Sequence, residues 1–256
     1  MPPAHAVAIF LAGVGAGTIN TIVGSGSLIT FPTLLLLGYA PIPANVSNNL
    51  GMVAGGLSGS FGYRRELAGH TAFLRRYAPI SLVGSVIGAV LLLVLPASAF
   101  ARIVPILIGL ALLLVVFGPR LQAAARSHHV DGVQPSWHTW ALGSGVFVAA
   151  VYGGYFGAAQ GVLLMGILSV LSSEHLQRLN GFKNVLALVV NAVAAVTFMV
   201  AAWSRISWPV VLLVGLGAFL GGFLGARVGR RMPSAVLRVV IIAIGVAAIV
   251  KLLWFS

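Results

Sequence analysis

The chain has 256 residues, of which 59% are hydrophobic and only 7% are charged. Soluble domains carry about 25% charged residues, so this composition excludes a soluble fold and predicts an integral membrane protein. Three carboxylates stand against fifteen Lys and Arg, and the chain has no Cys. These counts argue against two-carboxylate hydrolases, carboxylate-held metals, disulfides and thiolate chemistry. We therefore expect no enzyme, no catalytic residue, no metal and no cofactor.

The net charge of +12 comes from basic residues that interrupt long apolar runs. A nucleic-acid-binding domain gathers such residues on one polar face instead, so we expect the lipid bilayer, and not nucleic acid, as a partner. The positive-inside rule places the arginines near 63–76 and 119–136 in the cytoplasm and Arg102 and Arg205 on the other side. We expect a multi-pass protein of the cell (inner or plasma) membrane whose termini are both non-cytoplasmic. Association into a homo-oligomer is left open.

Charge clusters and Pro or Gly breaks divide the chain into ten apolar segments, with roughly 20 residues needed for each full crossing. The segments are 6–23, 25–38, 44–62, 73–95, 99–118, 137–156, 158–172, 178–203, 207–229 and 234–255. Segments 25–38 and 158–172 are too short to cross alone, and we expect half-helices, re-entrant segments or short spans there. The predicted fold is an all-α polytopic membrane protein with eight to ten transmembrane or half-membrane helices.

The two halves of the chain resemble each other. A shift of 135 positions places Asn45 on Asn180, Asn48 on Lys183, and Asn49 on Asn184. We predict an N-terminal repeat (1–118), a cytoplasmic connecting loop (119–136) and a C-terminal repeat (137–256). Five segments per half, an odd number, make the second repeat inverted, as in many secondary transporters. A duplicated scaffold that does not transport is the alternative.

Polar residues form a stripe on one face of segment 44–62 and again on segment 178–203. Such residues are costly against lipid, so each stripe should face the protein interior. Their amide N–H groups and one ammonium suit an oxyanion, and we predict that they bind substrate. They are Asn45, Asn48, Asn49, Asn180, Lys183, Asn184 and Asn191.

Each member of the stripe also has a plainer interpretation. Asn45 and Asn180 could instead cap helix N-termini. Asn191 could form only an interhelical hydrogen bond, and Lys183 could extend to the cytoplasmic interface. The sequence leaves these alternatives open.

Two Gly-rich segments occupy equivalent places in the two halves. A helix broken at this depth is tolerated where it lines a cavity or is packed by protein, and its exposed backbone N–H groups favour an anion. We expect Pro32 to prevent a regular helix after the first break. Close helix packing through glycine is the alternative, and we prefer it for Gly84, Gly88, Gly217, Gly221, Gly225 and Gly229. The predicted substrate-contacting residues of the breaks are Ser25, Ser27 and Gln160, with backbone approach at Gly24, Gly26, Gly157 and Gly161.

The chain resembles the TauE/SafE family of sulfite-exporter-type permeases. The resemblance is carried by Gly15–Gly17, by the run from Gly24 to Pro32, by Asn45–Asn49, by Tyr63–Arg65 and by a weaker second copy from 153 to 184. It implies export or uptake of sulfite, sulfonates or related anions. The sequence predicts a secondary transporter that exports a small anion. An anion channel of the same fold and a non-transporting membrane scaffold or assembly protein are the alternatives.

Overall fold

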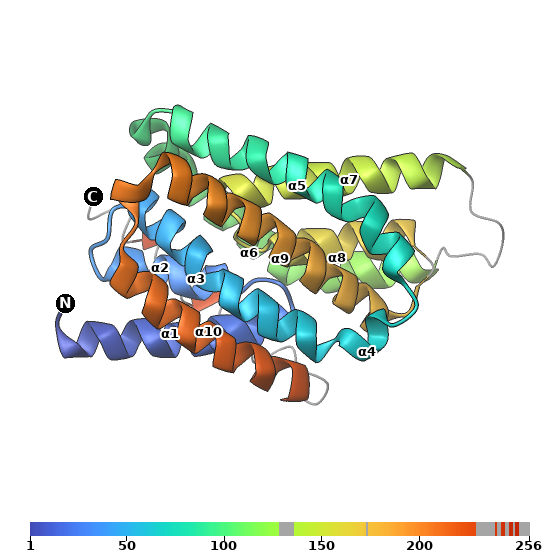
Figure 1. The fold of residues 1–256 in the computed structure, drawn as a ribbon, viewed down its shortest axis with the longest axis horizontal. Helices are drawn as coiled ribbons and strands as arrows, with labels where there is room; N and C mark the ends of the chain where they lie inside the picture. Colours follow the sequence, from blue (N-terminus) through green and yellow to red (C-terminus); the bar gives the residue numbers. More distant parts are fainter. Residues whose placement is uncertain are drawn as a thin grey trace.

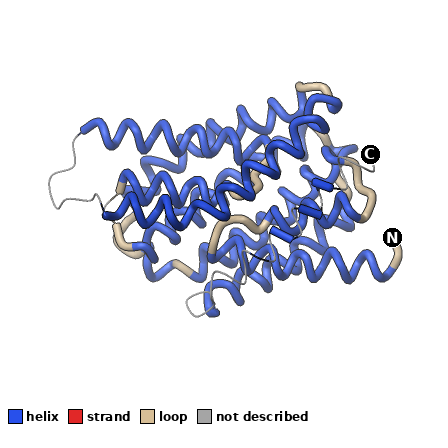
Figure 2. The backbone as a smooth tube through the Cα atoms, turned by 180° about the vertical axis from the view of Figure 1, so that it is seen from behind, coloured by secondary structure: helices blue, strands red, loops and turns tan. Residues whose placement is uncertain are grey.

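The computed structural model describes residues 1–127, 136–172 and 174–228, and in the last segment 239, 242–243, 246–247 and 249–250. Within this part the chain is helical and contains no strand (Figure 1; Figure 2). The elements are α1 (Pro3–Ile22), α2 (Ser27–Leu36), α3 (Pro41–Gly62), α4 (Arg64–Leu67), α5 (Thr71–Val94), α6 (Ala97–Ser127), α7 (Ser136–Tyr155), α8 (Gln160–Leu171), α9 (Leu176–Ala201), the 3₁₀ turn η1 (Trp203–Arg205) and α10 (Trp208–Val228).

The predicted segments match these helices closely, and the all-α polytopic fold is confirmed. Three boundaries were wrong. Helix α1 begins at Pro3, three residues before the predicted segment. Helix α3 begins at Pro41, which occupies the first helical position favoured by proline. Helix α6 continues to Ser127, so residues 119–127 of the predicted loop are helical, and Pro119 does not end the helix. The last predicted segment, 234–255, lies mostly outside the described residues, as do 128–135 of the loop.

Five described helices are long and apolar enough to cross a membrane: α1, α5, the 97–117 part of α6, α9 and α10. Helices α2 and α8 have 10 and 12 residues. At 1.5 Å per residue they extend about 15 and 18 Å, about half the hydrocarbon thickness. The expectation that these two segments are too short to cross alone is confirmed.

Each short helix follows a sharp break and folds back against the helix before it. Helix α2 packs on α1, where a Cβ atom at Gly26 would lie 2.8 Å from the Cβ of Asn20. Helix α8 packs on α7, where Gln160 covers Gly153. We call residues 20–26 tip 1 and residues 155–161 tip 2. Helix α2 runs through Pro32 to Leu36, which corrects the expectation that Pro32 prevents a regular helix.

The helices of the two predicted halves are interleaved. Helix α10 lies along α1, and α5 lies along α7 (Figure 1). Glycines make both contacts close: a Cβ atom at Gly84 would lie 2.8 Å from the carbonyl oxygen of Phe147, and one at Gly217 would lie 2.9 Å from the nitrogen of Val14. The packing role expected for these glycines is thus seen at Gly84, Gly88, Gly217, Gly221 and Gly225, while Gly229 lies outside the described residues. Each of these contacts pairs a helix of one predicted half with a helix of the other, which is the arrangement that two inverted repeats would produce. The inversion itself stays a prediction.

Candidate functional site

Helices α1 and α7 end in the same way. The N–H of Gly24 donates to the carbonyl oxygen of Ile19 at 3.1 Å, and that of Gly157 donates to Tyr152 at 3.2 Å. Both glycines have positive φ, 89° and 78°, a backbone conformation that glycine adopts without steric cost. The left-handed residue ends each helix and leaves its last carbonyl oxygens without helical partners. The two Gly-rich segments therefore are breaks, as predicted.

The two tips meet backbone to backbone. The N–H of Gly161 donates to the carbonyl oxygen of Gly24 at 2.9 Å. A Cβ atom at either position would overlap the other residue's backbone. Gly24 and Gly161 thus bring the two breaks together, and Gly26 lies against α1. Gly157 is half-buried at tip 2.

Helix α9 supplies three donors to the carbonyl end of α1. The Nζ of Lys183 lies 3.1 Å from Asn20 O and 3.3 Å from Thr21 O. The amides of Asn180 and Asn184 donate to the same Thr21 oxygen at 3.2 and 3.3 Å. The negative end of the α1 dipole favours a cation at this place. Three of the four stripe residues on α9 therefore converge on tip 1.

Lys183 is buried, with 1% of its surface exposed, so it does not extend to the cytoplasmic interface. It is the one charged side chain that is buried in the described part of the chain. Within that part it makes no ion pair with a carboxylate, and its hydrogen bonds go to main-chain oxygens. A buried ammonium is costly unless paired, and neutral carbonyl groups compensate its charge only in part.

Asn45 takes the corresponding place at tip 2. Its amide donates to the carbonyl oxygen of Tyr155 at 3.1 Å. Because α3 begins at Pro41 and α9 at Leu176, neither Asn45 nor Asn180 caps a helix. Both lie one turn inside and contact the other half of the chain.

The remaining stripe residues connect the inner helices. Thr30 on α2 donates its hydroxyl to the Oδ1 of Asn48. The amide of Asn49 donates to Asn191 Oδ1 at 3.3 Å, so Asn191 forms the interhelical bond considered as its plainer interpretation. These contacts lie between α2, α3 and α9, apart from those of Lys183.

The polar side chains of the breaks lie at the crossing of the tips. Ser25 follows Gly24, and Gln160 precedes Gly161, which are the two glycines in contact. The exposed fraction is 1% for Ser25 and 3% for Gln160. The Oγ of Ser25 and the Nε2 of Gln160 have no hydrogen-bond partner among the described residues. They are therefore available to a bound group at the crossing. Ser27 is half-buried at the start of α2.

Sequence reasoning missed the acceptors of the site. The carbonyl oxygens of Asn20 and Thr21 have no side-chain signature, and only Gly24, which ends α1, pointed to them. Thr30, which donates to Asn48, was not assigned to the site either. Tyr63 and Tyr152 were also missed: Asn180 donates to the Tyr63 hydroxyl at 2.7 Å, and the Tyr152 hydroxyl donates to Ala158 O at 2.6 Å.

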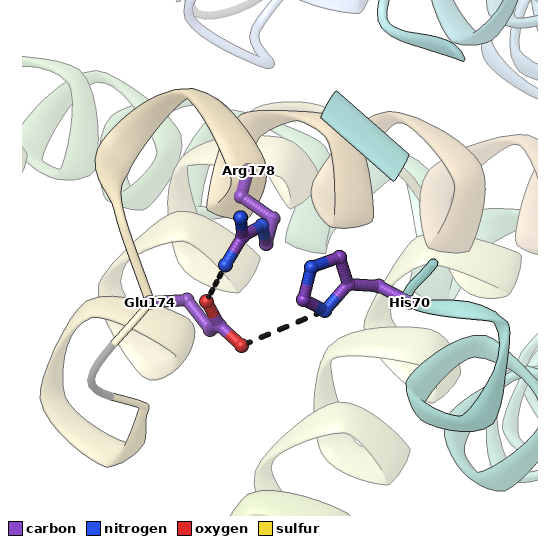
Figure 3. A network of polar contacts seen from close by, with 3 residues as sticks. All are labelled: His70, Glu174 and Arg178. Carbon is purple, nitrogen blue, oxygen red and sulfur yellow. Dashed lines mark hydrogen bonds and ion pairs between the residues drawn. The ribbon is translucent and has the colours of Figure 1, made fainter. Parts of the chain in front are cut away.

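A second polar cluster lies where the loop before α9 meets the start of α5. Glu174 accepts a hydrogen bond from Arg178, and its other oxygen lies 3.8 Å from His70 Nδ1 (Figure 3). About 30% of each side chain is exposed. A cavity of about 200 Å³ beside Glu174 contains none of the predicted site residues. Its lining is Phe73, Tyr77, His138, Thr139, Leu142, Leu171, Ser172 and Glu174.

Long apolar helices around two broken hairpins and a buried polar cluster define a polytopic membrane protein with a polar interior. The family model described as "Sulfite exporter TauE/SafE" matches residues 9–252. The chain belongs to this family.

Curated relatives agree with this assignment. The chain is 29% identical to the "Probable membrane transporter protein ORF9" of a Sinorhizobium species, over 96% of this chain and 91% of the relative. It is 30% identical to the "Probable membrane transporter protein YfcA" of Escherichia coli K12, over 69% and 66%. A Haemophilus influenzae "Probable membrane transporter protein" is 26% identical over 83% and 80%. No solved structure matches the chain significantly. The protein is a membrane transporter.

Proposed function

We propose that the protein is a secondary transporter that exports a small anion, and that its substrate is sulfite, an organosulfonate or a related sulfur oxyanion. The observation that carries the proposal is Lys183, a buried ammonium with no carboxylate partner in the described part of the chain. A mobile anion would supply the missing charge. The family's printed description, a sulfite exporter, supports this substrate class.

The groups around Lys183 suit an oxyanion in chemical type. A sulfur oxyanion presents several acceptor oxygens in a compact volume, while the ammonium and the amides of Asn180 and Asn184 are donors. Hydrogen bonds to a charged group are stronger than neutral ones, at about 1.5–3 kcal/mol each. The Ser25 hydroxyl and the Gln160 amide add donors at the crossing. A cation would meet one like charge and no buried carboxylate among the described residues.

The direction of transport follows from the membrane potential. An anion in a cell with a negative interior is driven outward by about 2.3 kcal/mol per charge for each 100 mV. The buried polar residues of the described part include no Asp or Glu, the usual intramembrane groups for proton coupling. Export driven by the potential requires no such group.

Flux into and out of proteoliposomes tests the proposal. Liposomes that contain the purified protein would be loaded with sulfite, thiosulfate, taurine, sulfoacetate or a carboxylate. Efflux of the loaded anion would be measured under an imposed membrane potential and, separately, under a pH gradient. We expect saturable efflux of a sulfur anion, stimulated by external anion through exchange and driven by the potential. Non-saturable current without exchange would indicate a channel, and no flux of any anion would indicate a scaffold. Flux that follows only the pH gradient would contradict the energetics.

A further inference from the structure

Three donors converge on one oxygen atom at the end of α1. Asn180, Lys183 and Asn184 all point at the carbonyl oxygen of Thr21, at 3.2–3.3 Å. A carbonyl oxygen has two lone pairs, and well-formed N–H···O bonds have lengths of about 2.9–3.0 Å. The oxygen therefore has more donors than it can satisfy, and each of these bonds is long.

The carbonyl end of α1 is available to these donors because the helix breaks there. In a continuing helix the N–H of Gly24 would bond to Asn20 O, but it bonds to Ile19 O instead. The oxygens of Asn20 and Thr21 thus face α9 with the partial negative charge of a helix C-terminus. They act on Lys183 as the oxygens of an anion would, with less charge.

We infer that the carbonyl oxygens of Asn20 and Thr21 compete with the substrate for Lys183 and Asn184, so that anion binding releases tip 1. This inference rests on the proposed function and identifies the moving part of the same site. An anion that takes the ammonium and one amide leaves the end of α1 held by Asn180 and by the backbone bond from Gly161 to Gly24. Tip 1 then keeps only one of its three donors from α9 and becomes more mobile, and this loosening is coupled to occupancy of the site.

Tip 2 is held differently and stays in place. Its carbonyls accept from the Asn45 amide at 3.1 Å and the Tyr152 hydroxyl at 2.6 Å. Asn48 corresponds to Lys183 in the offset that relates the halves, and it accepts from Thr30 instead of donating to tip 2. Since no cation among the described residues bonds to tip 2, an anion gains little by replacing its carbonyls. The two tips therefore differ in function despite their similar geometry.

Cysteine labelling can detect the release, because the chain has no native Cys. Val23→Cys would report on tip 1, and Ala158→Cys would report on tip 2, outside the predicted substrate contacts. Each variant in lipid nanodiscs would be labelled with a neutral maleimide with and without ethanesulfonate, which carries no thiol-reactive group. We expect labelling of Val23→Cys to rise about tenfold, the factor given by loss of one charge-assisted hydrogen bond. Labelling of Ala158→Cys should not change. Unchanged or slower labelling of Val23→Cys would overturn the inference.

Replacement of Lys183 by a residue without a charge provides a second test of the inference. Lys183→Gln in the Val23→Cys chain should raise labelling without anion and abolish the response to ethanesulfonate. Should that chain not fold, hydrogen exchange of residues 19–30 in the unmodified protein makes the same test, with faster exchange expected when sulfite is added. Anion-dependent thermal stabilisation of the protein would be measured in parallel. Stabilisation without release of tip 1 refutes this inference and leaves the proposed function standing, whereas neither binding nor flux of any anion refutes both.

Discussion

Asn45 and Asn180, which the offset of 135 residues relates, each donate an amide hydrogen bond to the last turn of a helix from the other half of the chain. Asn45 bonds to Tyr155 O at 3.1 Å at the end of α7, and Asn180 bonds to Thr21 O at 3.2 Å at the end of α1. The relationship explains why asparagine recurs here: one buried amide satisfies a carbonyl that a broken helix leaves without a partner.

The two amides are predicted to contribute unequally to stability. Asn45→Ala leaves the carbonyl of Tyr155 without this donor, and we expect the free energy of unfolding to fall by about 1–3 kcal/mol. In a Tyr63→Phe background, which removes the other bond of Asn180 at 2.7 Å, Asn180→Ala should cost less, because the Thr21 carbonyl keeps two donors from α9. Thermal unfolding in detergent measures both. Thr197→Ala is the control, because among the described residues its hydroxyl bonds only within its own helix, to Val193 O. Equal effects of all three would contradict the assignment.

The crossing of the tips is predicted to reject any side chain at Gly24. Gly24→Ala combines a positive φ with overlap against the Gly161 backbone, so we expect a large loss of melting temperature and of folded yield. Gly38→Ala is the matched control, since Gly38 has φ of 91° and no atom of another described residue within 4 Å of an added Cβ. It should cost only the left-handed conformation, about 1–2 kcal/mol. Equal losses would show that backbone strain, and not the contact between tips, makes Gly24 necessary.

Glycine is predicted to be required where α10 packs on α1. Gly221→Ala places a methyl group against the carbonyl of Val14, and we expect lower thermal stability because the helices must separate. Gly109→Ala on α6 meets no atom within 4 Å in the part of the chain that the structure describes. It should be neutral or stabilising by about 0.5–1 kcal/mol, because alanine favours helix. Melting temperatures of the two variants should move in different directions, and a parallel decrease would argue against close packing as the cause.

The orientation derived from the loop charges is directly measurable in cells. Arg205→Cys and Arg120→Cys each introduce a single exposed thiol. A membrane-impermeant maleimide should label Arg205→Cys in intact cells, because this end of α9 is predicted to be non-cytoplasmic. It should label Arg120→Cys only after the membrane is permeabilised. The reverse pattern would invert the predicted topology.

The helices and the polar stripe could be read from the sequence because both depend on side chains. Apolar runs and Pro or Gly breaks placed the helices within a few residues, and helical periodicity placed Asn45, Asn48 and Asn49 together on a buried face. The end of α6 was misplaced because Pro119 suggested a stop. The start of α3 was also misplaced, and this left open the capping interpretation of Asn45.

The partners of Lys183 could not be read from the sequence. They are main-chain oxygens, which every residue has, and they are exposed only because Gly24 adopts a positive φ and redirects its N–H to Ile19. Nor did the sequence show that the Gly-rich breaks would touch through Gly24 and Gly161, since a contact between segments so far apart depends on the packing of the whole bundle. The amides were predictable, but the carbonyl groups they hold were not.

Exchange of labelled sulfite in proteoliposomes would show whether Lys183 binds the transported anion. The unmodified protein, Lys183→Gln and Lys183→Arg would be compared, with Arg102→Gln as the exposed-cation control. We predict saturable exchange that Lys183→Gln lowers at least about tenfold, the loss of one hydrogen bond to a charged group, that Lys183→Arg partly restores, and that Arg102→Gln leaves unchanged. Full exchange by a folded Lys183→Gln protein would show that Lys183 does not bind the transported anion.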